Sequence, residues 1–186
     1  MTLRRHKVGF TLVEVMIVIF ALGVLSAMIM ISSSEAVATA KATKILNDMT
    51  QIKLAVIQWY RENPYKVGTN GKVGTQTLGD YFKTDKGKAE LMKHIDSTSI
   101  SLNDDAVGSY TVDTSNSNNG KTIYWYVAYK IHDGSNKDES LMNKLEAKAA
   151  TADLRRTSNF KNTNEKYHAG NETNKNIYML IMTFNY

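Results

Sequence analysis

Residues 10–31 read FTLVEVMIVIFALGVLSAMIMI, and this stretch contains one charged side chain, Glu14. A helix rises about 1.5 Å per residue, so the stretch reaches about 33 Å and can cross a hydrocarbon core of about 30 Å. The sequence therefore predicts a transmembrane segment over 10–31.

The residues before this segment predict its orientation. Residues 1–9 contain Arg4, Arg5 and Lys7 and no acid. Basic residues beside a membrane span favour the cytoplasmic side. We therefore expect a single-pass protein of the cytoplasmic (inner) membrane, with its N-terminus inside and the chain after Ile31 outside the cytoplasm.

The helical pattern continues beyond the apolar stretch, and no proline occurs before Pro64. Apolar residues recur at steps of four and three, which is the spacing of one helix face. These residues are Ala38, Ala42, Ile45, Met49, Ile52, Val56 and Trp59. We predict one helix from Phe10 to Arg61, whose part over 32–62 is amphipathic and which ends at Asn63–Pro64.

Glu14 needs an explanation, because a carboxylate within an apolar membrane core costs about 2.5–3.5 kcal/mol on insertion scales. Its cationic candidates on this chain are the basic residues of 1–9, or a new amine made by cutting between Gly9 and Phe10. In an assembly, such an amine could meet the Glu14 of a neighbouring subunit. The simpler alternative is a glutamate tolerated at the membrane interface.

The residues KVGFTLVE, Lys7 to Glu14, resemble the processing site of the type IV pilin and pseudopilin family. The resemblance covers roughly Arg4 to Met30. It implies a leader of residues 1–9, cleavage after Gly9 by prepilin peptidase, and N-methylation of Phe10 by the same enzyme. It also implies that Glu14 is needed for docking into a growing filament.

The same resemblance implies the partners and the kind of protein. The partners would be other pilin or pseudopilin subunits and an inner-membrane assembly platform with its ATPase. The chain itself would be structural, not an enzyme, and would need no cofactor and no metal. A type IV pilus, a type II secretion pseudopilus and a competence pilus all stay open as the assembly.

In two features this chain departs from the family pattern, and both bear on which kind of pilin or pseudopilin it is. Many members have a helix-kinking proline near the end of the apolar run, where this chain has Ile31. Many pilins also close a C-terminal loop with a disulfide, and this chain contains no cysteine. Both departures lean slightly toward a pseudopilin, a minor pilin or a cysteine-free lineage.

A conventional secretory signal peptide is the rival interpretation of the N-terminus. Small residues at alternate positions occur at Ala36-Val37-Ala38 and Ala38-Thr39-Ala40. Cleavage there would release an exported binding domain or enzyme, and an uncut segment would anchor one to the membrane. The helical stripe that runs straight through these positions argues against such a cut.

The remaining residues, 63–186, predict a globular α+β head in which an antiparallel sheet covers the stripe of the long helix. We expect a short helix within Thr77–Ile95 and a second helix over Lys137–Arg156. The β-branched and aromatic stretches predict strands, with a hairpin turn at Asn119–Gly120. The expected strands are Ser97–Leu102, Gly108–Asp113, Thr122–His132 and Ile177–Phe184.

Catalytic and metal-binding patterns are weak in this sequence. No HExxH, GxSxG or P-loop motif occurs, and we expect His94 and His132 to be ordinary surface residues. The segment 133–139 carries oxygen-rich side chains that suit Ca²⁺, but its spacing differs from an EF-hand loop. Ser135 and Asp138 instead predict the start of a helix.

Nucleic-acid binding is not favoured by the charge. The formal net charge is +5, and the three basic residues before the apolar run supply +3 of it. Tyr124, Trp125, Tyr126 and Tyr129 could form a stacking platform for DNA or another ligand, but alternate residues of a strand face opposite sides. We therefore expect these aromatic side chains to pack within the sheet.

Overall fold

The computed structural model describes residues 10–96, 100–102, 106–116, 121–134, 137–156, 166–167, 169 and 175–185, without the side chains of residues 31 and 32. The chain divides into two compact units, Met1–Ala38 and Thr39–Tyr186. We call the second the head unit. The long helix α1 (Leu12–Glu62) contributes to both units.

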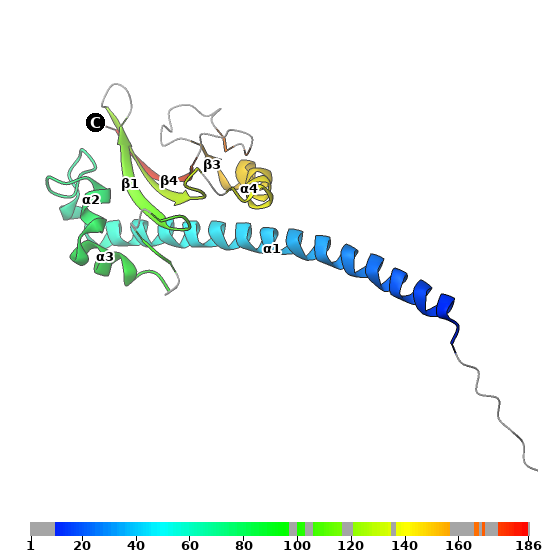
Figure 1. Ribbon diagram of the computed structural model, residues 1–186. Helices are drawn as coiled ribbons and strands as arrows, with labels where there is room; N and C mark the ends of the chain where they lie inside the picture. The colour runs from blue at the N-terminus through cyan, green and yellow to red at the C-terminus, as the bar shows by residue number, and fades with distance from the viewer. Residues whose placement is uncertain are drawn as a thin grey trace, which may run out of the picture. The chain divides into compact units, whose positions relative to one another are not determined.

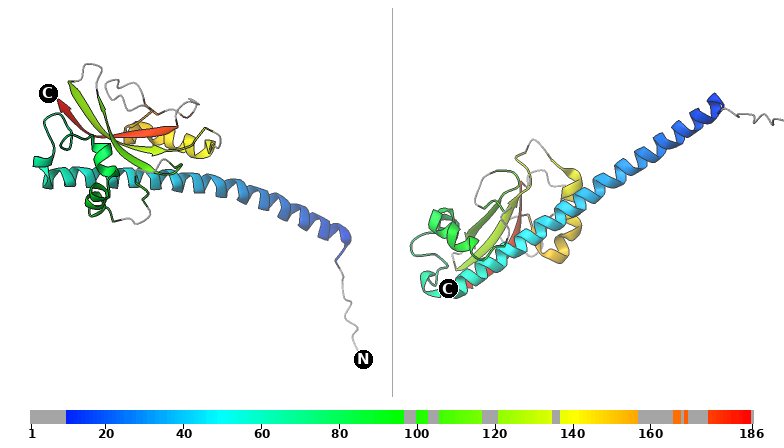
Figure 2. Two further views of the ribbon diagram at one scale, coloured as in Figure 1. Left: turned by 60° about the vertical axis from the view of Figure 1, so that its left-hand side comes forward. Right: turned by 90° about the horizontal axis from the view of Figure 1, so that it is seen from below.

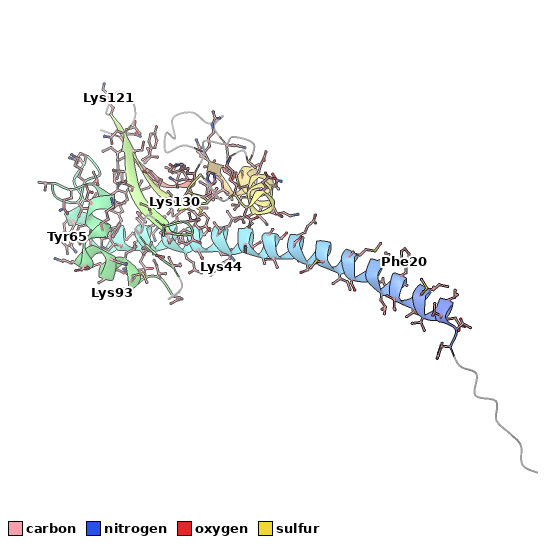
Figure 3. The ribbon with its side chains drawn as sticks, in the orientation of Figure 1. Phe20, Lys44, Tyr65, Lys93, Lys121 and Lys130 are labelled. Carbon is pink, nitrogen blue, oxygen red and sulfur yellow. The ribbon has the colours of Figure 1, made fainter. Side chains whose placement is uncertain are left out.

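In the first unit, the described structure is the first part of α1. Its large apolar side chains are exposed, from 42% at Val24 to 88% at Phe10. Side chains extend from both sides of the ribbon around Phe20 (Figure 3). The helix forms because leucine, methionine and alanine have high helix propensity and no glycine or proline except Gly23 interrupts the run.

In the head unit, residues 39–62 of α1 lie against a four-stranded antiparallel sheet (Figures 1 and 2). The strands are β1 (Tyr110–Asn116), β2 (Thr122–Lys130), β3 (Leu154–Arg155) and β4 (Asn176–Asn185), in the order β1-β2-β4-β3. Tyr110 pairs with Tyr129 at one end of the β1–β2 ladder, and Tyr129 pairs with Ile177 on β4. The α+β class predicted from the sequence is confirmed.

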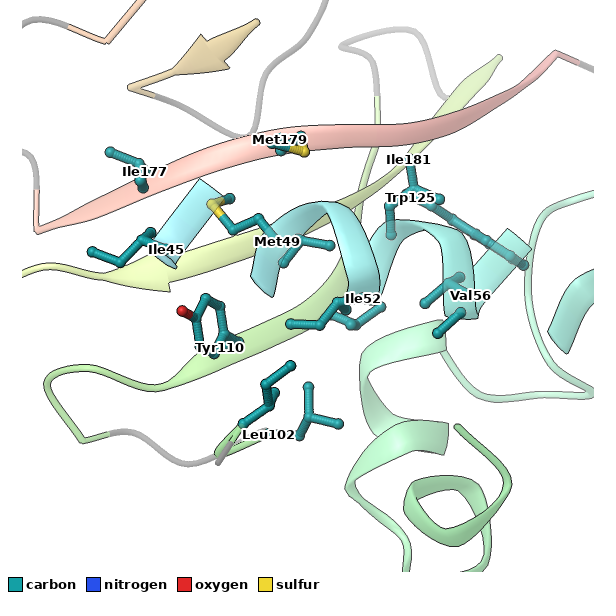
Figure 4. Close-up of a cluster of buried hydrophobic side chains, with 14 of the residues drawn as sticks. Ile45, Met49, Ile52, Val56, Leu102, Tyr110, Trp125, Ile177, Met179 and Ile181 are labelled. Atoms are coloured by element: carbon teal, nitrogen blue, oxygen red, sulfur yellow. The ribbon is translucent and has the colours of Figure 1, made fainter. Parts of the chain in front are cut away.

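The core lies between the sheet and one face of α1, as Figure 4 shows. The predicted stripe is buried here, because Met49, Ile52, Val56 and Trp59 are each fully enclosed and Ile45 is nearly so. From the sheet, β2 and β4 supply Trp125, Val127, Ile177, Met179 and Ile181. The stripe is covered because every third or fourth residue of a helix falls on one face.

Two short helices, α2 (Leu78–Lys83) and α3 (Asp85–Met92), pack near the C-terminal end of α1. A 3-10 turn, Pro64–Lys66, follows α1 directly. The sequence predicts one helix here, and the structure instead divides it at Thr84. The Thr84 hydroxyl accepts a hydrogen bond from the Gly87 N–H and so caps the start of α3. Such a side-chain bond offers the backbone an alternative to continuing the first helix.

The second predicted helix, Lys137–Arg156, is shorter than expected. Helix α4 runs from Glu139 to Ala152, and its last residue is followed by Asp153 in the left-handed conformation, with φ of 50°. The chain then pairs Leu154 with Met179, which forms the short strand β3. The sequence analysis missed this strand.

The remaining strand predictions hold with shifted ends. The predicted Gly108–Asp113 becomes β1, and Thr122–His132 and Ile177–Phe184 become β2 and β4. Of the predicted strand Ser97–Leu102, residues 97–99 lie outside the described residues, and its described part forms only a bridge from Leu102 to Tyr110. The predicted turn at Asn119–Gly120 also lies outside the described residues, although the β1–β2 pairing around it is antiparallel.

Candidate functional site at the start of the long helix

The first turn of α1 forms a reciprocal pair of hydrogen bonds between Thr11 and Glu14. The Glu14 N–H donates to the Thr11 hydroxyl oxygen at 3.2 Å, and the Thr11 N–H donates to Glu14 Oε2 at 2.8 Å. The Thr11 hydroxyl also donates to the same carboxylate oxygen at 3.0 Å. This is a capping box, which satisfies two backbone N–H groups that a helix start leaves without intrahelical partners.

The capping box gives Glu14 a local role that the sequence analysis did not identify. The signal was present, because Thr11-Leu12-Val13-Glu14 has the T-x-x-E spacing of this motif. A carboxylate at the N-terminal end of a helix is also favoured by the helix dipole. Thr11 therefore joins Phe10 and Glu14 among the residues of the candidate site, and Gly9 lies outside the described residues.

The surface around Glu14 is apolar and has no covering partner in the described part of the first unit. Phe10 is 88% exposed, and Ile17 and Val18 also face solvent. Gly23 has no atom within 4 Å of the position that a Cβ would take. Such a surface is suited to lipid or to other apolar helices, since burial of apolar area is favourable.

Among the described residues, α1 is the helix that is long and apolar enough to cross a membrane, by length and composition alone. None of its most apolar window is buried against the rest of the chain. This differs from the core helix of a soluble protein, in which the apolar window is mostly covered. The helix also continues without a break through 36–40, where a signal-peptide cut would fall.

The described part of the head unit offers no metal site that would compete with the start of α1. Its described residues contain no group of three or more His, Cys, Asp or Glu side chains arranged to hold a metal ion. Asp138 caps α4 by accepting the Leu141 N–H at 3.0 Å, which confirms the helix-start interpretation at that residue, while Ser135 lies outside the described residues.

His94 and His132 differ in how deeply they are buried. His94 is partly buried, and its Nε2 lies 3.4 Å from a Glu62 carboxylate oxygen. His132 is fully buried, so its prediction as a surface residue is wrong. Among the described residues, neither His132 nitrogen has a hydrogen-bond partner, so within this part of the chain the imidazole lacks the base-and-orienter contacts of a catalytic histidine.

Of the aromatic side chains of β2, Tyr124, Trp125 and Tyr126 are buried, as predicted, whereas Tyr129 is only partly buried. Trp125 is buried in the main core, and its Nε1 donates to the Gly71 carbonyl oxygen at 3.0 Å. Tyr124 and Tyr126 lie on the other face of the strand in a second apolar cluster, together with Ala128. They do not form an exposed stacking platform.

Residues 4–30 match the family model described as the prokaryotic N-terminal methylation motif. This is the prepilin-peptidase motif of type IV pilins and pseudopilins, so the resemblance seen in the sequence is confirmed. The match ends before the head unit begins. No curated protein and no solved structure matches the chain.

Proposed function

We propose that this chain is a structural subunit of a type IV pilus or a type II secretion pseudopilus. The observation that carries the proposal is the N-terminal methylation motif at 4–30, which overlaps an apolar helix with no covering partner in the described first unit. Proteins with this motif are processed filament subunits and are structural, not catalytic. The chain contributes no active site of its own to this scheme.

The proposed pathway starts in the cytoplasmic membrane, with residues 1–9 as a leader on the inner side and 10–31 as the membrane-spanning segment. Prepilin peptidase cuts between Gly9 and Phe10 and methylates the new Phe10 amine. An inner-membrane platform and its ATPase then move the subunit into the filament. There, contacts with other helices replace contacts with lipid.

Glu14 has two proposed roles in this pathway. In the single chain, the carboxylate accepts the Thr11 N–H and hydroxyl. In the filament, the same carboxylate would pair with the N-terminal amine of a neighbouring Phe10, which sets the axial register between subunits. A carboxylate in an apolar surrounding favours such a cationic partner, because an unpaired charge there is costly.

The first experiment tests processing. We would measure the intact mass and the N-terminal sequence of the membrane form, in cells with and without prepilin peptidase. We expect a start at Phe10 with one added methyl group only when the peptidase is present. A start near Thr39 or Lys41 would instead indicate a conventional signal peptide, and an intact Met1 in peptidase-positive cells would indicate an anchored domain.

The second experiment separates the capping role of Glu14 from its charge. Glutamine serves in a capping box as glutamate does, so Glu14→Gln preserves the cap and removes the negative charge. If pairing with the amine drives assembly, Glu14→Gln and Glu14→Ala both abolish filaments, whereas Thr11→Ala retains them in reduced amount. Normal filaments from Glu14→Gln would show that capping alone explains this glutamate.

A further inference from the structure

The head unit contains a groove where residues 41–48 of α1, one end of the β1–β2 pair and the start of α4 come together. Its volume is about 1050 Å³. Its charged lining residues are Lys41, Lys44, Lys137, Asp48, Asp138 and Glu139, and Tyr110 and Tyr129 line it beside them. The groove belongs to the head unit alone and is separate from the methylation motif.

Asp48 forms the base of this groove. The residue is only 6% exposed, and its Oδ2 accepts a hydrogen bond from the Tyr110 hydroxyl at 2.9 Å. In the described part of the chain, no hydrogen bond reaches the other oxygen, Oδ1, and no cation lies within ion-pair distance of the carboxylate. The one partner that the described residues give this carboxylate is a neutral phenol, so a cation that reaches it would add a charge-assisted hydrogen bond.

Two tyrosine rings stand beside this carboxylate. The ring centroids of Tyr110 and Tyr129 are 5.0 Å apart at an interplanar angle of 45°. The Tyr110 oxygen points toward the side of α1 that carries Ile45, which also lines the groove (Figure 4). Burial first, and then the negative charges of Asp48 and Asp138, raise the pKa of Tyr129, so its phenol stays neutral.

A weak ion pair lies at the rim of the groove, and one of its partners can be displaced by another cation. Lys41 Nζ lies 3.7 Å from Asp138 Oδ2, and both side chains are about half exposed. Exposed pairs of this kind contribute little stability, so an entering cation can replace Lys41 at Asp138. A metal ion fits less well, since the described residues hold no cluster of three or more metal-ligand side chains.

We propose that this groove binds an ammonium or guanidinium group carried on an apolar stem, with the cation between Asp48 and the rings of Tyr110 and Tyr129. The carboxylate supplies the charge-assisted hydrogen bond, and the aromatic faces attract the cation through their quadrupoles. The same chemistry occurs in a lysine or arginine side chain of a protein segment and in a free organic amine or guanidine. The site does not depend on the proposed filament, and its test needs no assembly.

The test uses the full chain in detergent micelles and isothermal titration calorimetry. The probes are two capped tripeptides, Gly-Arg-Gly and the same peptide with citrulline, which has nearly the same shape as arginine but no charge. The protein variants are Asp48→Asn, which keeps an acceptor for Tyr110, and Asp96→Asn as a matched control. Asp96 is exposed in the head unit and is not among the residues that line the groove.

We expect the arginine peptide to bind about 10-fold more tightly than the citrulline peptide, as one charge-assisted hydrogen bond provides. Asp48→Asn removes this preference, and Asp96→Asn retains it. Tyr129→Leu serves as a second variant and weakens arginine binding about 5-fold through loss of the ring. Thermal unfolding of each variant verifies that the head unit is folded.

Free ethylguanidine and propylamine identify the source of the cation. Binding of either as tightly as the arginine peptide assigns the groove to a free organic cation, and 10-fold tighter binding of the peptide assigns it to a protein segment. The proposal is overturned if neither peptide binds, if both bind equally, or if Asp48→Asn and Asp96→Asn weaken binding to the same extent. A failure here leaves the processing experiment unaffected, since that experiment reads only the N-terminus.

Discussion

The two halves of α1 are parts of one helix, yet their side chains have opposite surroundings. Over 12–30, every described side chain is exposed, although most are apolar. Over 39–62, the face that contains Met49, Ile52 and Val56 is completely buried by the sheet and the short helices. The difference lies in the pattern, because apolar residues surround the helix in the first half and follow one stripe in the second.

The two halves of α1 require different surroundings. A single stripe can be covered by one face of one sheet, and the head unit provides that face. A helix that is apolar on all sides needs apolar surroundings on all sides, which lipid or a bundle of other helices can supply. Substitutions on the buried stripe should therefore destabilise the head unit far more than substitutions at exposed positions of either half.

The largest loss of head stability is expected from a substitution at Trp59, where the buried stripe of α1 meets α2. Its ring is fully buried, 5.0 Å from Phe82 and 5.4 Å from Tyr81 between centroids. Trp59→Ala should lower the free energy of unfolding of the head by about 3–5 kcal/mol, since it leaves a large cavity. Urea unfolding in micelles, followed by the fluorescence of Trp125, measures the change.

Phe20→Ala is the matched control in the other half, because Phe20 is 75% exposed. We expect it to change head stability by less than about 0.5 kcal/mol, as other substitutions at uncovered sites do. A loss of unfolding free energy comparable to that of Trp59→Ala would show that the apolar half of α1 also stabilises the head. The distinction between the two halves would then be wrong.

The next prediction concerns the pH dependence of head stability, to which Glu90 contributes. Its carboxylate is hydrogen-bonded to three segments at the C-terminal end of α1. Burial alone would raise its pKa, but hydrogen bonds from Trp59, Tyr81 and Lys66 outweigh burial and lower the pKa to about 2. The folded-state pKa is thus below the unfolded value of 4.5, and the stabilisation is complete above that value. It should disappear as the pH falls toward about 2.

The expected loss is about 2 kcal/mol, which allows for solvent screening of the partly exposed carboxylate. Urea unfolding between pH 7 and pH 2 measures it, and Glu90→Gln should remove this part of the pH dependence. If the wild type and the variant lose stability in parallel, other carboxylates are responsible for the acid sensitivity.

A smaller effect is expected from the capping box. Thr11→Ala removes the hydroxyl that accepts the Glu14 N–H, and loss of such a cap costs about 1 kcal/mol of local helix stability. Hydrogen exchange of the amides in the first turn measures this loss. Thr43→Ala is the control, because the Thr43 hydroxyl donates to the Thr39 carbonyl within the helix and satisfies no helix end. Equal changes in both variants would argue against the cap.

The smallest change in head stability is expected from a substitution at Leu54. This residue lies in the second half of α1 but is 59% exposed. Leu54→Gln should change the free energy of unfolding by less than about 0.5 kcal/mol, whereas the neighbouring Ile52→Ala should lower it by about 2–5 kcal/mol. Thermal unfolding of both variants provides the comparison. A marked loss for Leu54→Gln would mean that the exposed face of 39–62 is also covered.

The sequence predicted the long helix and its buried stripe because both depend on periodicity, which is local. It did not predict the division at Thr84, since apolar residues continue on either side and only a threonine hydroxyl interrupts the helix. Strand β3 has two residues, Leu154 and Arg155, and no pattern of that length is distinguishable from a loop.

The roles of Gly9, Phe10 and Glu14 in processing and assembly stay predictions, whereas the local geometry at Glu14 can be compared with the sequence. Phe10 and Glu14 follow from the motif, but the bonds between Thr11 and Glu14 were missed although their spacing was visible. The burial of His132 and the groove above Asp48 depend on segments that are far apart in sequence. Such features follow from tertiary packing, which a single sequence without long-range pairing information does not specify.

The strand order has a consequence for the time course of folding during synthesis. Strand β4, which comprises residues 176–185, lies between β2 and β3 in the sheet, so the sheet cannot close before these residues have been synthesised. The contacts of Glu90 with Trp59, Lys66 and Tyr81 are complete much earlier. Until β4 is made, a nascent chain therefore has an unpaired edge on β2, and such an edge exposes the chain to aggregation.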